Sequence, residues 1–189
     1  MTAENQLRKH IEEVVHLTDE EYRFVLSHFL IENYRKNDFL IRSGDKTTQC
    51  YYVVYGLLKL VLEDEDGKQH IASFAMEDWW ESDFSAFFSG NRAKLSLQCI
   101  EDSKVFVISL KNYNKLAAGL PKMEHFFLKK SHSGHIALQN RVLSFLTSNA
   151  TERYEQLLKQ HPVLFQRVPK TLLASYLGVS RETLSRLSS

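Results

Sequence analysis

Two arginines and a glutamate near the end of the chain form the stretch whose chemistry is easiest to interpret. At about 100° per residue of helix, Arg181, Glu182, Ser185 and Arg186 fan over one arc of roughly 140°, whereas Leu184 points the opposite way. An arginine fork can donate to guanine O6 and N7, and a glutamate can accept from cytosine N4. The pattern predicts one face that packs and one that reads the DNA major groove.

Short hydroxyl side chains and a lysine surround this face. The spacing predicts contacts with DNA phosphates rather than with bases, because these side chains are short or sit at a helix start. The predicted phosphate contacts are Lys170, Thr171, Ser180, Thr183 and Ser185.

The segment before the arginines has the pattern of a second helix. Leucines and a tyrosine recur at helical spacing from Leu172 to Leu177, Gly178 permits a tight turn, and Ser180 stands where the next helix needs an N-cap. Ala174 is small where two helices would cross. The spacing predicts a helix-turn-helix, and the alternative is an ordinary helical hairpin with a solvated charged face.

At Ser180-Arg-Glu-Thr-Leu-Ser-Arg186 the chain resembles the recognition helix of the Crp/Fnr family of bacterial transcription regulators. The resemblance implies a homodimer that presents two such helices to a palindromic double-stranded DNA site, with Arg181, Glu182 and Arg186 on base edges. It also suggests RNA polymerase as a partner. No strand hairpin follows the recognition helix, so we expect the wing found in some members to be absent or truncated.

The composition is that of a soluble globular protein. The 189 residues are 43% hydrophobic and 25% charged, and no apolar run approaches the ~20 residues that span a bilayer. The N-terminus does not read as a signal peptide, so we expect a cytoplasmic protein. Cys50 and Cys99 are too few for a four-cysteine iron–sulfur cluster, which we therefore do not expect.

The net charge of +1 conceals an asymmetry. Residues 1–121 hold 14 Lys/Arg against 19 Asp/Glu, whereas residues 122–189 hold 10 against 4. The basic end is the end with the predicted helix-turn-helix, which supports nucleic-acid binding there.

The rest of the chain predicts an α+β fold. Residues 4–30 read as helical, with a second, capped helix start at Thr18-Asp-Glu-Glu21. Strands are expected at 51–54, 57–62, 71–75, 95–99 and 105–108, which suggests an antiparallel β-roll of jelly-roll type. The order of a Gly-Asp turn, a Tyr-rich strand and an Asp-Gly hairpin is similar to the cyclic-nucleotide-binding roll of the same family. The expected domains are a roll with flanking helices at 1–120, a long dimerisation and linker helix at 121–150, and the DNA-binding domain at 151–189.

The ligand chemistry of that roll departs from the resembled pattern. Where members that bind cyclic nucleotides carry a Gly-Glu pair, this chain has Glu81 and Ser82, and the nearest later cations are Arg92 and Lys94. An extra carboxylate would repel a cyclic phosphate, so we expect no standard cyclic-nucleotide site. These four residues and Trp80 are the candidate pocket for an unidentified small effector, although Trp79 and Trp80 are more typical of core or lid positions.

The predicted long helix has a polar middle, Lys129 to His135, for which two interpretations remain open. It is either a switchable part of the dimer seam or a solvated stretch covered by the partner's roll, and we favour the second. His132 and His135 are three residues apart but lack further ligands, so we expect no metal site. Thr151 is the expected N-cap of the next helix, which ends before His161 and Pro162.

Two other functional classes compete with a regulator. One is an effector-binding adaptor without productive DNA contact, which the intact Arg181, Glu182 and Arg186 argue against. The other is a cupin-like metalloenzyme, which needs several histidines in the barrel, whereas the roll offers His70 alone. We therefore do not expect an enzyme.

Overall fold

The computed structural model describes residues 1–47 and 49–187, beginning with two short helices, α1 (Ala3–Glu12) and α2 (Asp19–Leu26). Thr2 caps α1, and Thr18 and Glu21 form a reciprocal capping box at the start of α2. The predicted capped start at Thr18 is therefore confirmed, but the helical stretch ends at Leu26 rather than at residue 30, and Leu30 already belongs to a strand.

The centre of the molecule is an antiparallel β-roll, which confirms the predicted fold class. Its two four-stranded sheets have the orders β1-β8-β3-β6 and β2-β7-β4-β5. The three strands that the sequence pattern missed are short or lie at a sheet edge, where alternation is weak. The strands are β1 (Leu30–Tyr34), β2 (Phe39–Ile41), β3 (Gln49–Tyr55), β4 (Leu58–Glu63), β5 (Gln69–Ala75), β6 (Trp80–Glu81), β7 (Ser96–Cys99) and β8 (Ser103–Ser109).

The turn between β3 and β4 brings backbone against backbone. Gly56 has φ +109°, and a Cβ there would lie 2.7 Å from the Asp102 carbonyl oxygen and 2.7 Å from the Ser103 Cα. Only glycine fits both the left-handed conformation and this approach. The turn therefore fixes the end of β3 against the start of β8.

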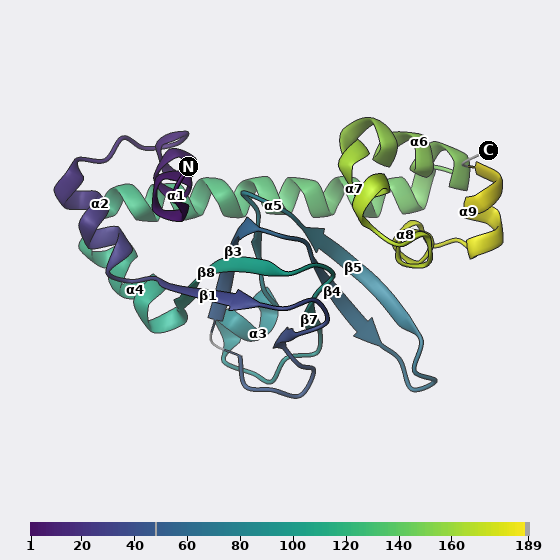
Figure 1. Ribbon diagram of the computed structural model, residues 1–189, viewed down its shortest axis with the longest axis horizontal. Coiled ribbons are helices and arrows are strands. Elements are labelled where there is room, and N and C mark those ends of the chain that lie inside the picture. Colours follow the sequence, from purple (N-terminus) through teal and green to yellow (C-terminus); the bar gives the residue numbers. More distant parts are fainter. Residues whose placement is uncertain (48, 188–189) are drawn as a thin grey trace.

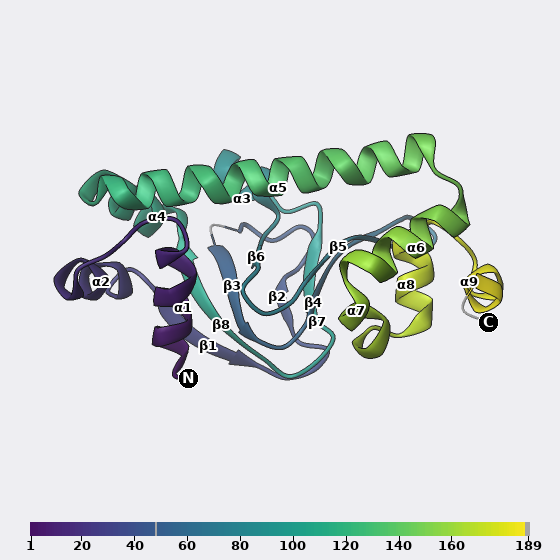
Figure 2. The same ribbon diagram turned by 90° about the horizontal axis from the view of Figure 1, so that it is seen from above.

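A long helix crosses the molecule above the roll (Figures 1 and 2). After α3 (Phe84–Ser89) and α4 (Leu110–Gly119), helix α5 (Pro121–Thr147) runs for 27 residues, or about 40 Å. Pro121 stands at its first position, where the missing N–H costs nothing. Figure 1 shows α1, α2 and α4 at one end of α5, α3 beside the roll, and the helices that follow α5 in the chain at its other end.

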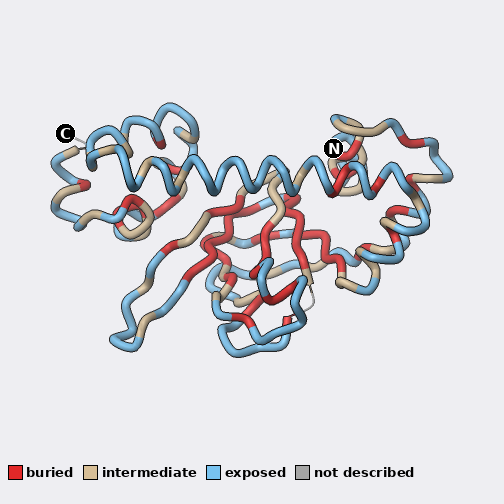
Figure 3. The backbone as a smooth tube through the Cα atoms, turned by 180° about the vertical axis from the view of Figure 1, so that it is seen from behind, coloured by how far each residue is buried: buried red, intermediate tan, exposed pale blue. Residues whose placement is uncertain are grey.

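Packing along α5 is uneven. Met123, Phe126 and Phe127 are buried in a core that α5 shares with α1, α2, α4 and the roll. By contrast, every residue from 131 to 140 is exposed, and Figure 3 shows the middle of the helix in pale blue. No described part of the chain buries any residue of that stretch.

Four helices complete the chain: α6 (Ala150–Gln160), α7 (Pro162–Arg167), α8 (Lys170–Leu177) and α9 (Arg181–Leu187). The predicted cap at Thr151 was wrong by two residues. Asn149 caps α6, because its side chain accepts from the Glu152 N–H at 3.1 Å and the Glu152 carboxylate accepts from the Asn149 N–H at 2.9 Å. Helix α7 was not predicted, although Pro162 stands at its first position, where a proline commonly begins a helix. The final residues of the predicted DNA-binding domain, 188–189, lie outside the described residues.

Candidate nucleic-acid interface and effector region

Helices α8 and α9 meet at a tight turn around Gly178. This residue has φ +68° and closes α8 in the left-handed conformation, and the Val179 N–H donates to the Ala174 carbonyl at 3.0 Å. Leu173, Ala174 and Leu184 are each at most 3% exposed, so the two helices cross on a buried apolar contact. The helix-turn-helix geometry expected from the leucine spacing is therefore present.

The opposite side of α9 is free of packing. Arg181, Glu182 and Arg186 are all exposed on this seven-residue helix, while Leu184 anchors its inner face. Hydrogen bonds from the backbone N–H of Glu182 and the Ser180 hydroxyl hold the pKa of the Glu182 carboxyl below its ordinary value. The face therefore presents two cations and an ionised acceptor at neutral pH.

The predicted phosphate contacts fall into two groups. Lys170 and Thr171 are exposed at the start of α8, and Ser185 is exposed on α9. Ser180 instead works as the N-cap of α9, since its Oγ accepts from the Thr183 N–H at 3.1 Å. Its hydroxyl also pairs with that of half-buried Thr183, so these two side chains have intramolecular partners already.

Three arginines of the basic end turn inward, which the sequence did not indicate. Arg141 stacks 3.6 Å from the Tyr176 ring centre and donates to the carbonyls of Ile71 and Tyr176. Arg153 donates to the carbonyls of Ser148 and Leu177. The third is Arg167, at the end of α7. These cations hold the helices together and to the roll, so the positive charge of the basic end is not all available for DNA.

The candidate effector residues do not converge on one cavity. Trp80 packs with Tyr52 and Phe126, and its indole N–H donates to the His10 Nε2 at 3.2 Å. The His10 Nδ1 is buried without a hydrogen-bond partner among the described residues, although the Glu13 carboxylate lies 3.7 Å away, and burial lowers the pKa of this histidine to about 4. Trp80 thus closes the junction of α1, α5 and the roll.

Glu81 is buried between the two sheets. Its Oε2 lies 2.5 Å from the Ser73 hydroxyl on β5, and its Oε1 accepts from the Ser82 N–H at 3.1 Å. Only 7% of the residue is exposed, and no cation of the described residues forms an ion pair with it. Burial therefore raises the pKa of Glu81 to about 7, despite the two hydrogen bonds that favour its ionised form.

The neighbouring acid, Asp83, satisfies the backbone donors around α3. Its carboxylate accepts from the N–H groups of Ala86 (3.1 Å), Lys94 (2.8 Å) and Leu95 (3.1 Å). Arg92 turns away, donating to the Gly44 carbonyl at 2.7 Å, and both Arg92 and Lys94 are exposed. The site therefore places two buried carboxyls where an anionic ligand would need positive charge.

Two further features were sought among the described residues: a cluster of metal ligands and a membrane-spanning helix. Across residues 1–47 and 49–187, no group of three or more His, Cys, Asp and Glu side chains could hold a metal ion. His132 and His135 are both exposed on α5. None of the helices described is long and apolar enough to cross a bilayer.

The sequence of the chain is similar to a known domain family and to known transcription regulators. Residues 31–119 match the cyclic nucleotide-binding domain. The cAMP-activated global transcriptional regulator CRP of Salmonella typhimurium is 24% identical over 180 residues, covering 90% of this chain and 86% of that protein. The transcriptional regulatory protein btr of Bordetella pertussis is 28% identical over 162 residues, covering 79% of this chain and 66% of that protein.

Solved structures share the whole architecture. FixK2 from Bradyrhizobium japonicum superposes with a TM-score of 0.73 at 18% identity, over 85% of this chain and 82% of that one. The c-di-GMP responsive global regulator CLP of Xanthomonas campestris gives 0.71 at 18% identity, over 90% and 89%. The roll, the long helix and the C-terminal helices therefore form one known fold.

Proposed function

We propose that the chain is a transcription regulator of the Crp/Fnr family, which binds a palindromic DNA site as a homodimer and reads it with α9. The observation that carries the proposal is the exposed set of Arg181, Glu182 and Arg186 on a helix whose other face is anchored by buried Leu184. Such a helix fits the major groove and offers donors and an acceptor to base edges. The proposed function needs no catalytic group.

The dimer is proposed from the surface of α5. Leu138, Val142 and Leu146 are 60%, 50% and 75% exposed and follow one another at four-residue spacing. Apolar side chains at this spacing form a stripe that a helix ordinarily buries against a partner. We therefore place the seam between two copies along the C-terminal half of α5. RNA polymerase as a partner stays a prediction of the family resemblance.

Substitution of Arg181 by alanine is expected to weaken binding to the preferred duplex by about 1–3 kcal/mol and to relax the choice of base at one position. The reason is the loss of a two-donor fork on a base edge. Fluorescence anisotropy with a selected duplex and its single-base variants measures both effects. Arg35→Ala, which removes an exposed cation from the roll, is the matched control. An equal loss on all sequences would assign Arg181 to a phosphate instead.

We further propose that the roll is not a standard cyclic-nucleotide site. Buried Glu81 offers no positive charge and, when ionised, would repel a cyclic phosphate. The Asp83 carboxylate already accepts from three backbone N–H groups, and Arg92 is engaged with the Gly44 carbonyl. Adding millimolar cAMP or cGMP should leave the melting temperature unchanged, because a ligand stabilises only by binding the folded state. A rise of several degrees with either nucleotide would overturn this proposal. An unidentified effector of other chemistry remains compatible with it.

A further inference from the structure

The DNA-binding helices are docked on the roll through strand β5 and helix α8. The Ser175 hydroxyl donates to the Gln69 carbonyl at 2.8 Å and accepts from the Ile71 N–H at 3.2 Å. Buried side chains of the roll, among them Ile71 and Phe74, share one apolar cluster with Leu173 and Leu177 of α8. The two parts therefore have a defined contact beside the covalent connection at 148–149.

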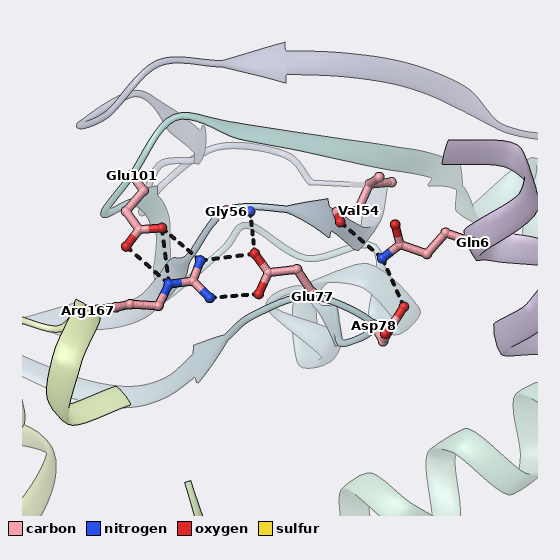
Figure 4. Close-up of polar contacts among 7 residues, drawn as sticks. All are labelled: Gln6, Val54, Gly56, Glu77, Asp78, Glu101 and Arg167. Carbon is pink, nitrogen blue, oxygen red and sulfur yellow. Dashed lines mark hydrogen bonds and ion pairs between the residues drawn. The ribbon is translucent and has the colours of Figure 1, made fainter. Parts of the chain in front are cut away.

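A second contact lies at the far end of α7, where one arginine meets two carboxylates of the roll (Figure 4). Arg167 Nη1 and Nη2 lie 2.7 and 3.0 Å from the two oxygens of Glu77, in the turn after β5. Its Nη2 and Nε lie 2.7 and 3.2 Å from the oxygens of Glu101, in the turn after β7. All three guanidinium nitrogens are engaged in this clamp, which we define as Arg167, Glu77 and Glu101.

The roll holds its side of the clamp rigidly. Glu77 Oε1 also accepts from the Gly56 N–H at 2.9 Å, in the turn that admits only glycine. The next residue, Asp78, accepts from the Gln6 side-chain amide at 3.0 Å and from the Tyr52 hydroxyl at 2.6 Å. The same short turn thus links α1, the roll and the DNA-binding helices.

The two carboxylates of the clamp determine whether Arg167 can contact DNA. Two carboxylates face one guanidinium, and hydrogen bonds to Glu101 and then Glu77 raise the pKa of Arg167. A phosphate would have to displace both partners and would meet their negative charge, so Arg167 is not suited to DNA contact. This separates it from Lys170, three residues later at the exposed start of α8.

We propose that Arg167 is a positioning residue, which fixes the orientation of the helix-turn-helix on the roll and thereby the spacing of the two recognition helices in the dimer. The inference rests on the proposed function. The connection at 148–149 and the contact between β5 and α8 leave the helices free to pivot about the line that joins these two points, whereas a third fixed point at Arg167 removes that freedom. Two recognition helices must meet half-sites about one helical turn, or ~34 Å, apart. A fixed orientation makes that spacing stringent.

The test removes the two negative charges while keeping side-chain size, with Glu77→Gln and Glu101→Gln together. The control is Glu12→Gln with Asp19→Asn, because Arg8 also pairs with two carboxylates, at 3.0 and 2.7 Å, but within α1 and α2. Hydrogen exchange without DNA should be at least about fivefold faster in residues 162–177 of the clamp variant, since released helices open more often. The control should leave these amides unchanged.

The second readout is spacing preference, measured with duplexes whose selected half-sites are moved apart or together by one base pair. Wild type and the control should prefer one spacing at least about tenfold, and the clamp variant should lose most of that preference. Faster exchange with an unchanged preference would refute a positioning role, and unchanged exchange would refute the clamp itself. If wild type selected no sequence at all, the proposed function would fail, while the exchange measurement would still judge the clamp. Glu77→Gln alone serves as the milder variant if the double variant does not fold.

Discussion

Leu138→Glu together with Val142→Glu, both on α5, is expected to convert the protein to a monomer and to weaken binding to a two-half-site duplex by at least about a hundredfold. Both native side chains, Leu138 and Val142, are half or more exposed. At a seam they would be buried in the dimer, where unpaired charges are costly. A monomer binds one half-site and loses the effective concentration of the second recognition helix, commonly worth 10² to 10⁴.

Sedimentation equilibrium measures the oligomeric state, and fluorescence anisotropy with the two-half-site duplex measures the affinity. The control is Leu30→Glu with Leu62→Glu, which adds the same charge at side chains that are 64% and 44% exposed on the roll. This control should remain dimeric and keep its affinity. A dimeric Leu138→Glu, Val142→Glu variant would show that the seam lies elsewhere than the C-terminal half of α5.

Glu81→Gln is expected to remove a pH dependence of about 3 kcal/mol from the free energy of unfolding. Burial raises the pKa of Glu81 to about 7, above its ordinary value near 4.5, so the folded state holds the proton more tightly than the unfolded chain does. The resulting stability is fully present below the unfolded pKa and is lost as the pH rises through 7. Wild type should therefore lose this contribution between about pH 4 and pH 8.

Urea unfolding at several pH values measures the difference, because glutamine keeps the size of the side chain and can accept from the Ser82 N–H without charge. Glu65→Gln, in the exposed β4–β5 hairpin, should retain the wild-type slope. Parallel pH profiles for wild type and Glu81→Gln would contradict the raised pKa and would mean that water or a relaxed backbone solvates the carboxylate.

The helix-turn-helix was predictable because its signals are local. A glycine at the turn, a hydroxyl at the N-cap and leucines at helical spacing each act within a few residues, and the structure has Gly178, Ser180 and Leu184 in those places. The roll was predictable as a class from alternation and hairpin turns. Its edge strands β1 and β6 were not, because a half-exposed or two-residue strand has almost no pattern to detect.

Contacts between residues that are far apart in the chain could not be predicted from the sequence pattern. Nothing local indicates that Arg167 meets Glu77 and Glu101, which are 90 and 66 residues away. Likewise, Arg92 was a reasonable cation for a ligand, and its bond to the Gly44 carbonyl depends on how two distant turns meet. The extra carboxylate at Glu81 could be predicted from the sequence. The role of Asp83 as an acceptor for three backbone N–H groups could not, because it depends on the folded backbone.

The central claim is that two copies of α9 read a palindromic site. The most direct measurement is selection of bound sequences from random duplex DNA at a stated salt concentration, without added ligand, because affinity for DNA depends steeply on salt. We predict an inverted repeat whose half-sites are about one helical turn apart, and an Arg181→Ala variant that loses preference at one base of each half-site. Recovery of a single unrepeated half-site, or of no sequence at all, would contradict the account.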